Sequence, residues 1–284
     1  MLIGHAKSLV GVLALPEDEV RARSPAIVIL NTGIVHRVGH HRMYVTMARR
    51  LARAGHAVLR FDLSGLGDSR RRANGSNPHA DAHEDTREAV DWLAGKFGFK
   101  DVLVMGLCSG SDVALRYGHT DPRVVGLVLL DPEVPPTARF YTNYIRERIS
   151  RLPSWLTFAR GRGRIWGDVA SMVATVATRG AIESTSRAEL EHHYRCSIAQ
   201  GIHLFVALTG GDLAWRQTYR EQLLDAFPSV PFADRLRLEY FPKSDHTLTP
   251  AEDRARLNDM LEEWLRTTSF RQGSLEPPHE RQLA

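Results

Sequence analysis

Six short apolar runs, separated by stretches with helical spacing, constrain the fold of this chain more than any other feature. Most of the runs are continuously apolar rather than alternating, as is typical of strands buried on both faces of a sheet. Between the runs, apolar residues recur on one helical face, as Met43, Met47 and Leu51 do. This alternation predicts an α/β fold, with a mostly parallel central sheet flanked by helices. The runs are Ala26–Leu30, Ala57–Leu63, Val102–Met105, Val124–Leu130, Leu204–Leu208 and Leu236–Tyr240.

The two ends of the chain carry further signals. Ahead of the first run, His5–Leu15 is expected to form an antiparallel hairpin around Gly11. After the last run, a closing helix is predicted to begin just after Thr249-Pro250, a pair suited to a helix start. Residues 268–284 turn polar and contain proline, so they are predicted to form a loose tail.

One segment interrupts the alternation of strands and helices. Residues 132–200 show helical stretches rich in Arg, Tyr and Trp and no strand pattern, between the fourth and fifth runs. A helical insertion there would cover the strand ends, where open α/β sheets bind ligands. Residues 1–131 and 201–267 are therefore expected to form the core, and residues 132–200 a helical cap.

The composition narrows the classes of function. Hydrophobic residues make up 43% and charged residues 25% of the chain, the balance of a soluble globular protein. We find no signal peptide and no apolar stretch that could span a bilayer. Two cysteines are too few for a disulfide framework and fit a reducing compartment, so a cytoplasmic location is expected. The net charge is only +4 and the arginines are scattered, which argues against a nucleic-acid partner.

The segment Gly106-Leu107-Cys108-Ser109-Gly110 directly follows the third run and directly precedes a helical stretch. This strand–turn–helix setting is that of a nucleophile elbow, in which a sharp turn exposes the central side chain. The pattern places Cys108 at the centre, at a helix N-terminus that favours a thiolate. Ser109 would then give its backbone N–H to an oxyanion hole. The alternative is that Cys108 is only a small buried residue.

The elbow and two further segments together resemble the α/β-hydrolase superfamily, and the resemblance extends from about Gly4 to Arg266. Leu30-Asn31-Thr32-Gly33-Ile34 is similar to the loop that supplies an oxyanion donor. The resemblance implies Ile34 N–H as that donor, with Gly33, Gly106 and Gly110 as supporting turn residues. Phe61-Asp62-Leu63-Ser64-Gly65-Leu66-Gly67-Asp68-Ser69 looks like a turn that is structural in the superfamily, and no chemistry is assigned to it.

The same resemblance implies an acid and a histidine after later strands. Asp212 follows the fifth run and His246 follows the sixth, which gives the order nucleophile, acid, histidine. Asp131, at the end of the fourth run, is the competing acid, and Asp212 is favoured over it. Asp245 adjoins His246, so its side chain is expected to point elsewhere.

A closer likeness is to the cysteine-bearing hydrolases associated with exosortase A systems. The likeness rests on "VHRVGHHRMYVTMARRLARAGHAVLRFDLSGLGDS", "GLCSGSDVAL" and "DPRVVGLVLLDPE". This likeness narrows the branch of the superfamily without supplying a reaction. The cysteine elbow and the resemblance to the superfamily imply an acyl-transfer enzyme, a thioesterase, esterase or acyltransferase, that uses Cys108 and requires no cofactor. The substrate would be a small acyl ester or thioester, which a carrier protein or CoA could present. A binding protein without turnover and a peptidase-like hydrolase are the alternatives.

Two side-chain groups outside this pattern have simpler interpretations. His192 and Cys196 would share a helical face, but too few further ligands accompany them for a metal site. Arg37 or Arg42, in the loop after the first run, could bind an anion, but tying the loop down by an ion pair is the favoured interpretation.

Overall fold

The computed structural model describes residues 1–4, 6–17, 23–72, 77–150, 187–211 and 217–270. Within these residues, eight strands form one sheet in the order β1-β2-β4-β3-β5-β6-β7-β8. The pairs from β4 through β3 to β8 are all parallel, while β1 and β2 join the sheet antiparallel. The strands are β1 Leu2–Ile3, β2 Leu9–Ala14, β3 Arg23–Ile29, β4 His56–Phe61, β5 Val102–Leu107, β6 Val124–Leu130, β7 His203–Thr209 and β8 Leu236–Phe241.

The six predicted strands are confirmed, with ends that shift by a few residues. Every residue of β4, β5 and β6 is buried, and this burial explains why β5 and β6 contain no polar residue. The predicted α/β class, a mostly parallel sheet flanked by helices, is therefore correct.

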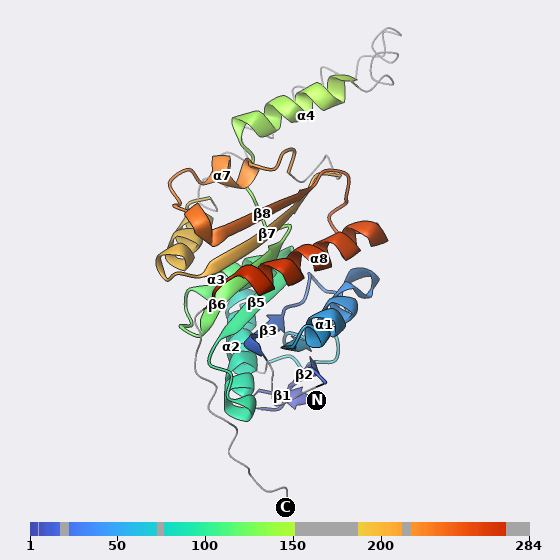
Figure 1. Ribbon diagram of the computed structural model, residues 1–284, viewed down its shortest axis with the longest axis vertical. Helices are drawn as coiled ribbons and strands as arrows, with labels where there is room; N and C mark the ends of the chain where they lie inside the picture. Colours follow the sequence, from blue (N-terminus) through green and yellow to red (C-terminus); the bar gives the residue numbers. More distant parts are fainter. Residues whose placement is uncertain (5, 18–22, 73–76, 151–186, 212–216, 271–284) are drawn as a thin grey trace, which may run out of the picture.

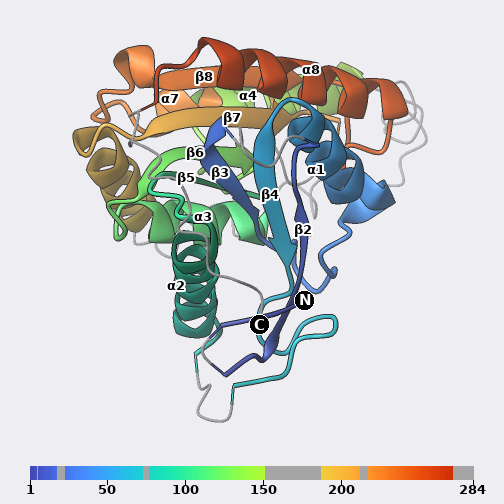
Figure 2. The ribbon, with the colours of Figure 1, turned by 60° about the horizontal axis from the view of Figure 1, so that its bottom comes forward.

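Helices cover both faces of the sheet (Figures 1 and 2). On one face, α1 and α8 pack their apolar sides against β3, β5 and β7. On the other face lie α2, α3, α7 and a helix formed by residues 187–199. Among the described helices, none is both long enough and apolar enough to cross a membrane. The bounds are α1 Met43–Arg53, α2 Pro78–Phe97, α3 Ser109–Gly118, α4 Ala138–Ser150, α7 Gln222–Ala226 and α8 Ala251–Thr267.

The expected opening hairpin is present, but its turn was predicted at the wrong place. β1 pairs with β2 through Leu2 opposite Val10, so the chain reverses before Leu9 rather than at Gly11. Gly11 lies inside β2, opposite Phe61 of β4. A Cβ there would lie 3.2 Å from the side chain of Leu59 and 3.3 Å from that of Phe61. The glycine thus allows two strands to approach closely and does not form a turn.

The closing helix begins where the sequence predicted, since Pro250 is the residue before α8. Its buried face includes Leu261 and Trp264. Phe270 stacks edge-on against Trp264, with ring centroids 5.3 Å apart. The remainder of the expected tail, residues 271–284, lies outside the described residues.

The expected cap is described only in part. Figure 1 shows α4 beyond α7 and β8, at the end of the molecule opposite β1. Residues 187–199, by contrast, cover the sheet: Leu190 and Tyr194 are buried in the core, and the ring of Tyr194 lies 5.2 Å from that of Phe227. Residues 151–186 lie outside the described part, so the boundaries of the cap remain a prediction.

Candidate active site

Cys108 occupies the sharp turn between β5 and α3. Its backbone has φ 56° and ψ −124°, a conformation that residues other than glycine rarely adopt. The turn is held in place because Cys108 N–H donates to the carbonyl of Leu130 at 2.9 Å. The Ser111 hydroxyl, one turn into α3, lies within hydrogen-bond distance of the carbonyls of Gly106 (2.7 Å) and Leu130 (2.8 Å). The side chain of Cys108 is therefore presented at the carboxyl edge of the sheet and at the first turn of a helix.

Two glycines make this tight turn possible. A Cβ on Gly106 would lie 2.3 Å from the backbone carbon of Gly110. A Cβ on Gly110 would lie 2.3 Å from the carbonyl oxygen of Asn31. Both distances are far inside van der Waals contact, so only glycine lets the strand, the helix and the loop after β3 pass one another.

His246 is held by a carboxylate from the end of another strand. Its Nδ1 forms a hydrogen bond with Oδ2 of Asp131, the first residue after β6. The other oxygen of Asp131 accepts a hydrogen bond from Thr209 N–H at 3.1 Å. The side chain of Asp131 is fully buried, whereas that of His246 is 20% exposed. The carboxylate can thus orient the imidazole.

The sequence points to two further acids in connection with His246, Asp212 and Asp245. Asp212, the acid favoured by the sequence, lies outside the described residues. Asp245 accepts hydrogen bonds from the backbone N–H groups of Thr247 and Thr249 and from the hydroxyl of Thr247. Burial opposes ionisation of Asp245, but these hydrogen bonds outweigh it and lower the pKa of its carboxyl. Asp131 is therefore the described carboxylate that contacts His246.

The loop after β3 faces the elbow. Gly33, at φ +51°, donates its N–H to the hydroxyl of Ser109 at 2.8 Å. The hydroxyl of Ser109, to which the sequence assigned no role, thus bridges the elbow and this loop. The next residue, Ile34, has a side chain that is strongly exposed (87%). Its N–H remains a predicted oxyanion donor.

A buried carboxylate anchors the same loop. Asp62 accepts hydrogen bonds from Asn31 Nδ2 at 3.2 Å, from the backbone N–H of Arg37 at 2.6 Å, and from the Arg37 guanidinium. The guanidinium also pairs with Asp68. The ion-pairing role favoured for Arg37 is thus confirmed. In the same turn, the Ser69 hydroxyl donates to the carbonyl of Asp62, a structural contact of the kind expected there.

Sequence reasoning missed Tyr44, the second residue of α1. Its ring is fully buried, and its hydroxyl accepts from Leu107 N–H at 2.9 Å and contacts Thr32 Oγ1 at 2.7 Å. These partners lie 63 and 12 residues away along the chain. No local pattern marks such a contact, because it exists only once α1 packs on the sheet.

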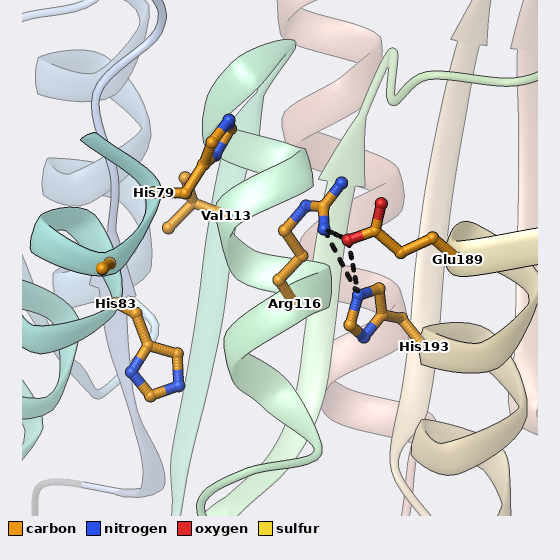
Figure 3. Close-up of a pocket in the computed structure, with 7 residues that line it drawn as sticks. His79, His83, Val113, Arg116, Glu189 and His193 are labelled. Carbon is orange, nitrogen blue, oxygen red and sulfur yellow. Dashed lines mark hydrogen bonds and ion pairs between the residues drawn. The ribbon is translucent and has the colours of Figure 1, made fainter. Parts of the chain in front are cut away.

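A second group of polar residues lies away from the elbow, between α3 and the helix at 187–199. Figure 3 shows Arg116 of α3 pointing toward Glu189 and His193 at a cavity of about 290 Å³. Nearby, Cys196 Sγ lies 3.6 Å from Nε2 of His192. In the described residues, no three His, Cys, Asp or Glu side chains are placed to hold a metal ion.

The parallel sheet, the strained Cys108 turn and the Asp131–His246 pair together define an α/β hydrolase. The sequence pattern of one family, described as serine aminopeptidase, S33, matches residues 24–191, more than half of the chain. The chain belongs to this family. The family is described as serine aminopeptidase, whereas this chain carries cysteine at the centre of the turn between β5 and α3.

Solved structures share the fold at low sequence identity. Est1E from Butyrivibrio proteoclasticus, solved with ferulic acid bound, superposes with a TM-score of 0.58 at 14% identity, over 91% of this chain and 94% of that one. An alpha-beta serine hydrolase homologue from Coxiella burnetii gives 0.57 at 12% identity, over 90% and 91%. The Pyrococcus furiosus esterase Pf2001 gives 0.56 at 17% identity, over 91% of each chain. No curated protein matches the sequence.

Proposed function

We propose that the protein transfers acyl groups through a thioester on Cys108. The observation that carries this proposal is the strained backbone of Cys108 at the first turn of α3, at the carboxyl edge of the sheet. A thiol at a helix N-terminus is more acidic than a free thiol, because the helix dipole stabilises the thiolate. A backbone conformation this unfavourable persists where the surrounding structure enforces it, which is typical of functional residues.

In the proposed reaction, His246 accepts the proton of the Cys108 thiol, and the sulfur attacks the acyl carbonyl carbon. The tetrahedral intermediate collapses as the bond to the leaving oxygen or sulfur breaks, and His246 returns the proton to that atom. Water, or another acceptor, then attacks the thioester with His246 as general base. The bond between the acyl carbon and the Cys108 sulfur breaks, the acyl product leaves, and His246 returns its proton to that sulfur. Asp131 orients His246 and stabilises its protonated form through the Nδ1 hydrogen bond.

Two backbone N–H groups are proposed to bind the developing oxyanion. One is that of Ser109, which directly follows the nucleophile. The other is that of Gly33, which in this structure donates to the Ser109 hydroxyl at 2.8 Å and so is directed at an oxygen atom across the gap. The carbonyl oxygen of a substrate would replace this hydroxyl as acceptor. Ile34 N–H, in the same turn, stays a prediction of the sequence.

The proposed substrates are small esters or thioesters. A thioester intermediate suits activated acyl groups better than stable amides, and the esterases among the solved structures share this fold. Presentation by a carrier protein or by CoA is part of the same proposal. Both Cys108 and Cys196 are thiols in this structure, in keeping with the reducing, cytoplasmic location that we propose.

The decisive experiment is covalent trapping with short acyl thioesters and p-nitrophenyl esters. Intact-mass and peptide analysis should find the acyl adduct on Cys108. Cys108→Ala should abolish the adduct, and His246→Ala should slow its formation or its hydrolysis. Cys196→Ala is the matched control and should behave as wild type. An adduct on Ser109, or full turnover by Cys108→Ala, would overturn the proposal.

The family description favours one other substrate class, amino-acid amides. Amino-acid p-nitroanilides therefore belong in the same panel, and faster turnover of these than of esters would support a peptidase. Binding of the panel without turnover of any member would instead support a receptor.

A further inference from the structure

We propose that the hydroxyl of Tyr44 is a positioning group. By bonding to Leu107 and Thr32, it fixes the distance between the elbow and the loop after β3, residues 30–34, here called the oxyanion loop. This inference rests on the proposed function, because it concerns the site at which the oxyanion of that reaction would form. Tyr44 would act through the backbone of the elbow and of the loop after β3, because its hydroxyl bonds to Leu107 and Thr32.

The pairing of β3 with β5 ends before the chain reaches the proposed site. β3 and β5 pair in parallel up to Ile29 opposite Met105, and the last backbone bond between them is Leu30 N–H to the carbonyl of Met105 at 2.9 Å. Beyond this point the chains separate into the oxyanion loop and the elbow. Ladder bonds therefore no longer fix their spacing where the reaction would occur.

The Tyr44 hydroxyl bridges the two chains just past the end of this ladder. It accepts a hydrogen bond from Leu107 N–H at 2.9 Å, and it contacts the side-chain oxygen of Thr32 at 2.7 Å. Leu107 immediately precedes Cys108, and Thr32 immediately precedes Gly33. The bridge thus reaches the backbone one residue from the nucleophile and one residue from the proposed oxyanion donor.

Burial keeps the hydroxyl of Tyr44 protonated. Tyr44 is 0% exposed, and burial raises the pKa of its phenol to about 12, so the hydroxyl keeps its proton at neutral pH. Since its oxygen accepts from Leu107 N–H, its single proton is available for Thr32 Oγ1. The hydroxyl of Tyr44 thus joins Leu107 and Thr32 in one buried chain of hydrogen bonds, in which either Tyr44 or Thr32 can be the donor of the second bond.

The bridge matters because oxyanion donors act only within a narrow range of distances. Removing the oxygen of Tyr44 leaves the buried N–H of Leu107 and the hydroxyl of Thr32 without this partner. Each would shift toward another partner, and the spacing between the elbow and the loop after β3 would then depend on other contacts, such as the hydrogen bond from Gly33 N–H to the Ser109 hydroxyl. Stabilisation of a developing oxyanion is sensitive to shifts of this size, whereas simple access to the sulfur is not.

The test compares two reactions of the same cysteine in Tyr44→Phe. Acylation by a p-nitrophenyl ester forms an oxyanion, while alkylation by iodoacetamide does not. We expect acylation to slow by about tenfold or more through kcat, and alkylation to stay within about twofold of wild type. The matched control is Tyr117→Phe, which also removes a buried phenolic hydrogen bond, to Asp121, but away from the site. It should leave both rates within about twofold of wild type.

A second variant separates positioning from a loss of folding. Thr32→Val removes the other end of the bridge and should also slow acylation. The double variant with Tyr44→Phe should be acylated about as slowly as Tyr44→Phe alone. Thr32→Ser, which keeps the hydroxyl, should retain the wild-type rate. Equal losses of acylation and alkylation, or additive effects of the two variants, would overturn the positioning role.

The outcome for the wild-type protein distinguishes this proposal from the proposed function. If wild-type Cys108 is never acylated, the proposed function fails and the positioning role fails with it. If wild type is acylated and Tyr44→Phe is acylated at the same rate, only the positioning role is overturned.

Discussion

Asp131 and His246 are hydrogen-bonded to each other although 115 residues separate them in the sequence. Asp131 directly follows β6, and His246 lies in the loop between β8 and α8. The end of β7 lies between them, and Thr209 at that end donates to the same carboxylate. The parallel sheet thus brings three strand ends together at the edge where Cys108 emerges.

The pairing of Asp131 with His246 predicts which acid supports the reaction. Asp131→Asn should lower acylation by about a hundredfold or more, because an amide at this position no longer stabilises protonated imidazole. Asp212→Asn should have a much smaller effect, since Nδ1 of His246 is already bonded to Asp131. Ester turnover by the two purified variants checks this. A larger loss in Asp212→Asn would restore Asp212 as the acid.

The close approach at Gly110 predicts opposite effects for two glycine-to-alanine changes. Gly110→Ala would place a Cβ 2.3 Å from the Asn31 carbonyl oxygen. We expect it to lower stability by about 1–3 kcal/mol and to impair acylation. Gly95→Ala, in α2 where a Cβ meets nothing within 4 Å, should raise stability by about 0.5–1 kcal/mol. Urea unfolding of both variants tests the contrast, and similar effects would contradict it.

The buried hydroxyl of Tyr194 predicts a stabilising substitution. The ring is fully buried against Phe227 and Phe232, and its hydroxyl finds no hydrogen-bond partner among the described residues. Tyr194→Phe keeps the packing and removes the unsatisfied group, so stability should be unchanged or rise by about 1 kcal/mol. In Tyr117→Phe, which loses a bond to Asp121, stability should instead fall by about 1–2 kcal/mol. Thermal unfolding distinguishes the two; a clear loss in Tyr194→Phe would reveal a partner for its hydroxyl.

The lowered pKa of His193 in the folded protein predicts that the free energy of unfolding decreases in acid. Burial, followed by the charges of His119 and Arg116, lowers the pKa of His193 to about 4. In the unfolded chain the pKa lies near 6.5, so between about pH 6.5 and pH 4 the unfolded state binds a proton that the folded state does not. Stability should therefore fall as the pH drops through this range.

The matched measurement uses His193→Gln. Its unfolding midpoint should depend less on pH than that of wild type below about pH 6.5, and the difference between the two proteins should be constant above about pH 7. Parallel curves from pH 4 to pH 8 would contradict the assignment.

The local part of the fold and site could be read from the sequence. The strands are continuous apolar runs because both faces of the sheet are covered, and burial on both faces leaves a direct mark on composition. The elbow is equally local: glycines at positions 106 and 110 are required by contacts of the turn with its surroundings, and Cys108 lies between them. The turn of the opening hairpin was misplaced, because Gly11 serves close strand packing rather than reversal.

The tertiary structure alone decided which groups meet. The sequence favoured Asp212 over Asp131 beside His246, although both follow strands of one parallel sheet. The structure shows the contact of His246 with Asp131, and Asp212 lies outside the described residues. The hydroxyl of Tyr44 has no sequence signal at all, because its two partners lie on segments that only the packing of α1 brings together. Periodicity and turn chemistry depend on neighbouring residues and are written along the chain. Hydrogen bonds between strand ends depend on strand order and register, which the fold as a whole determines.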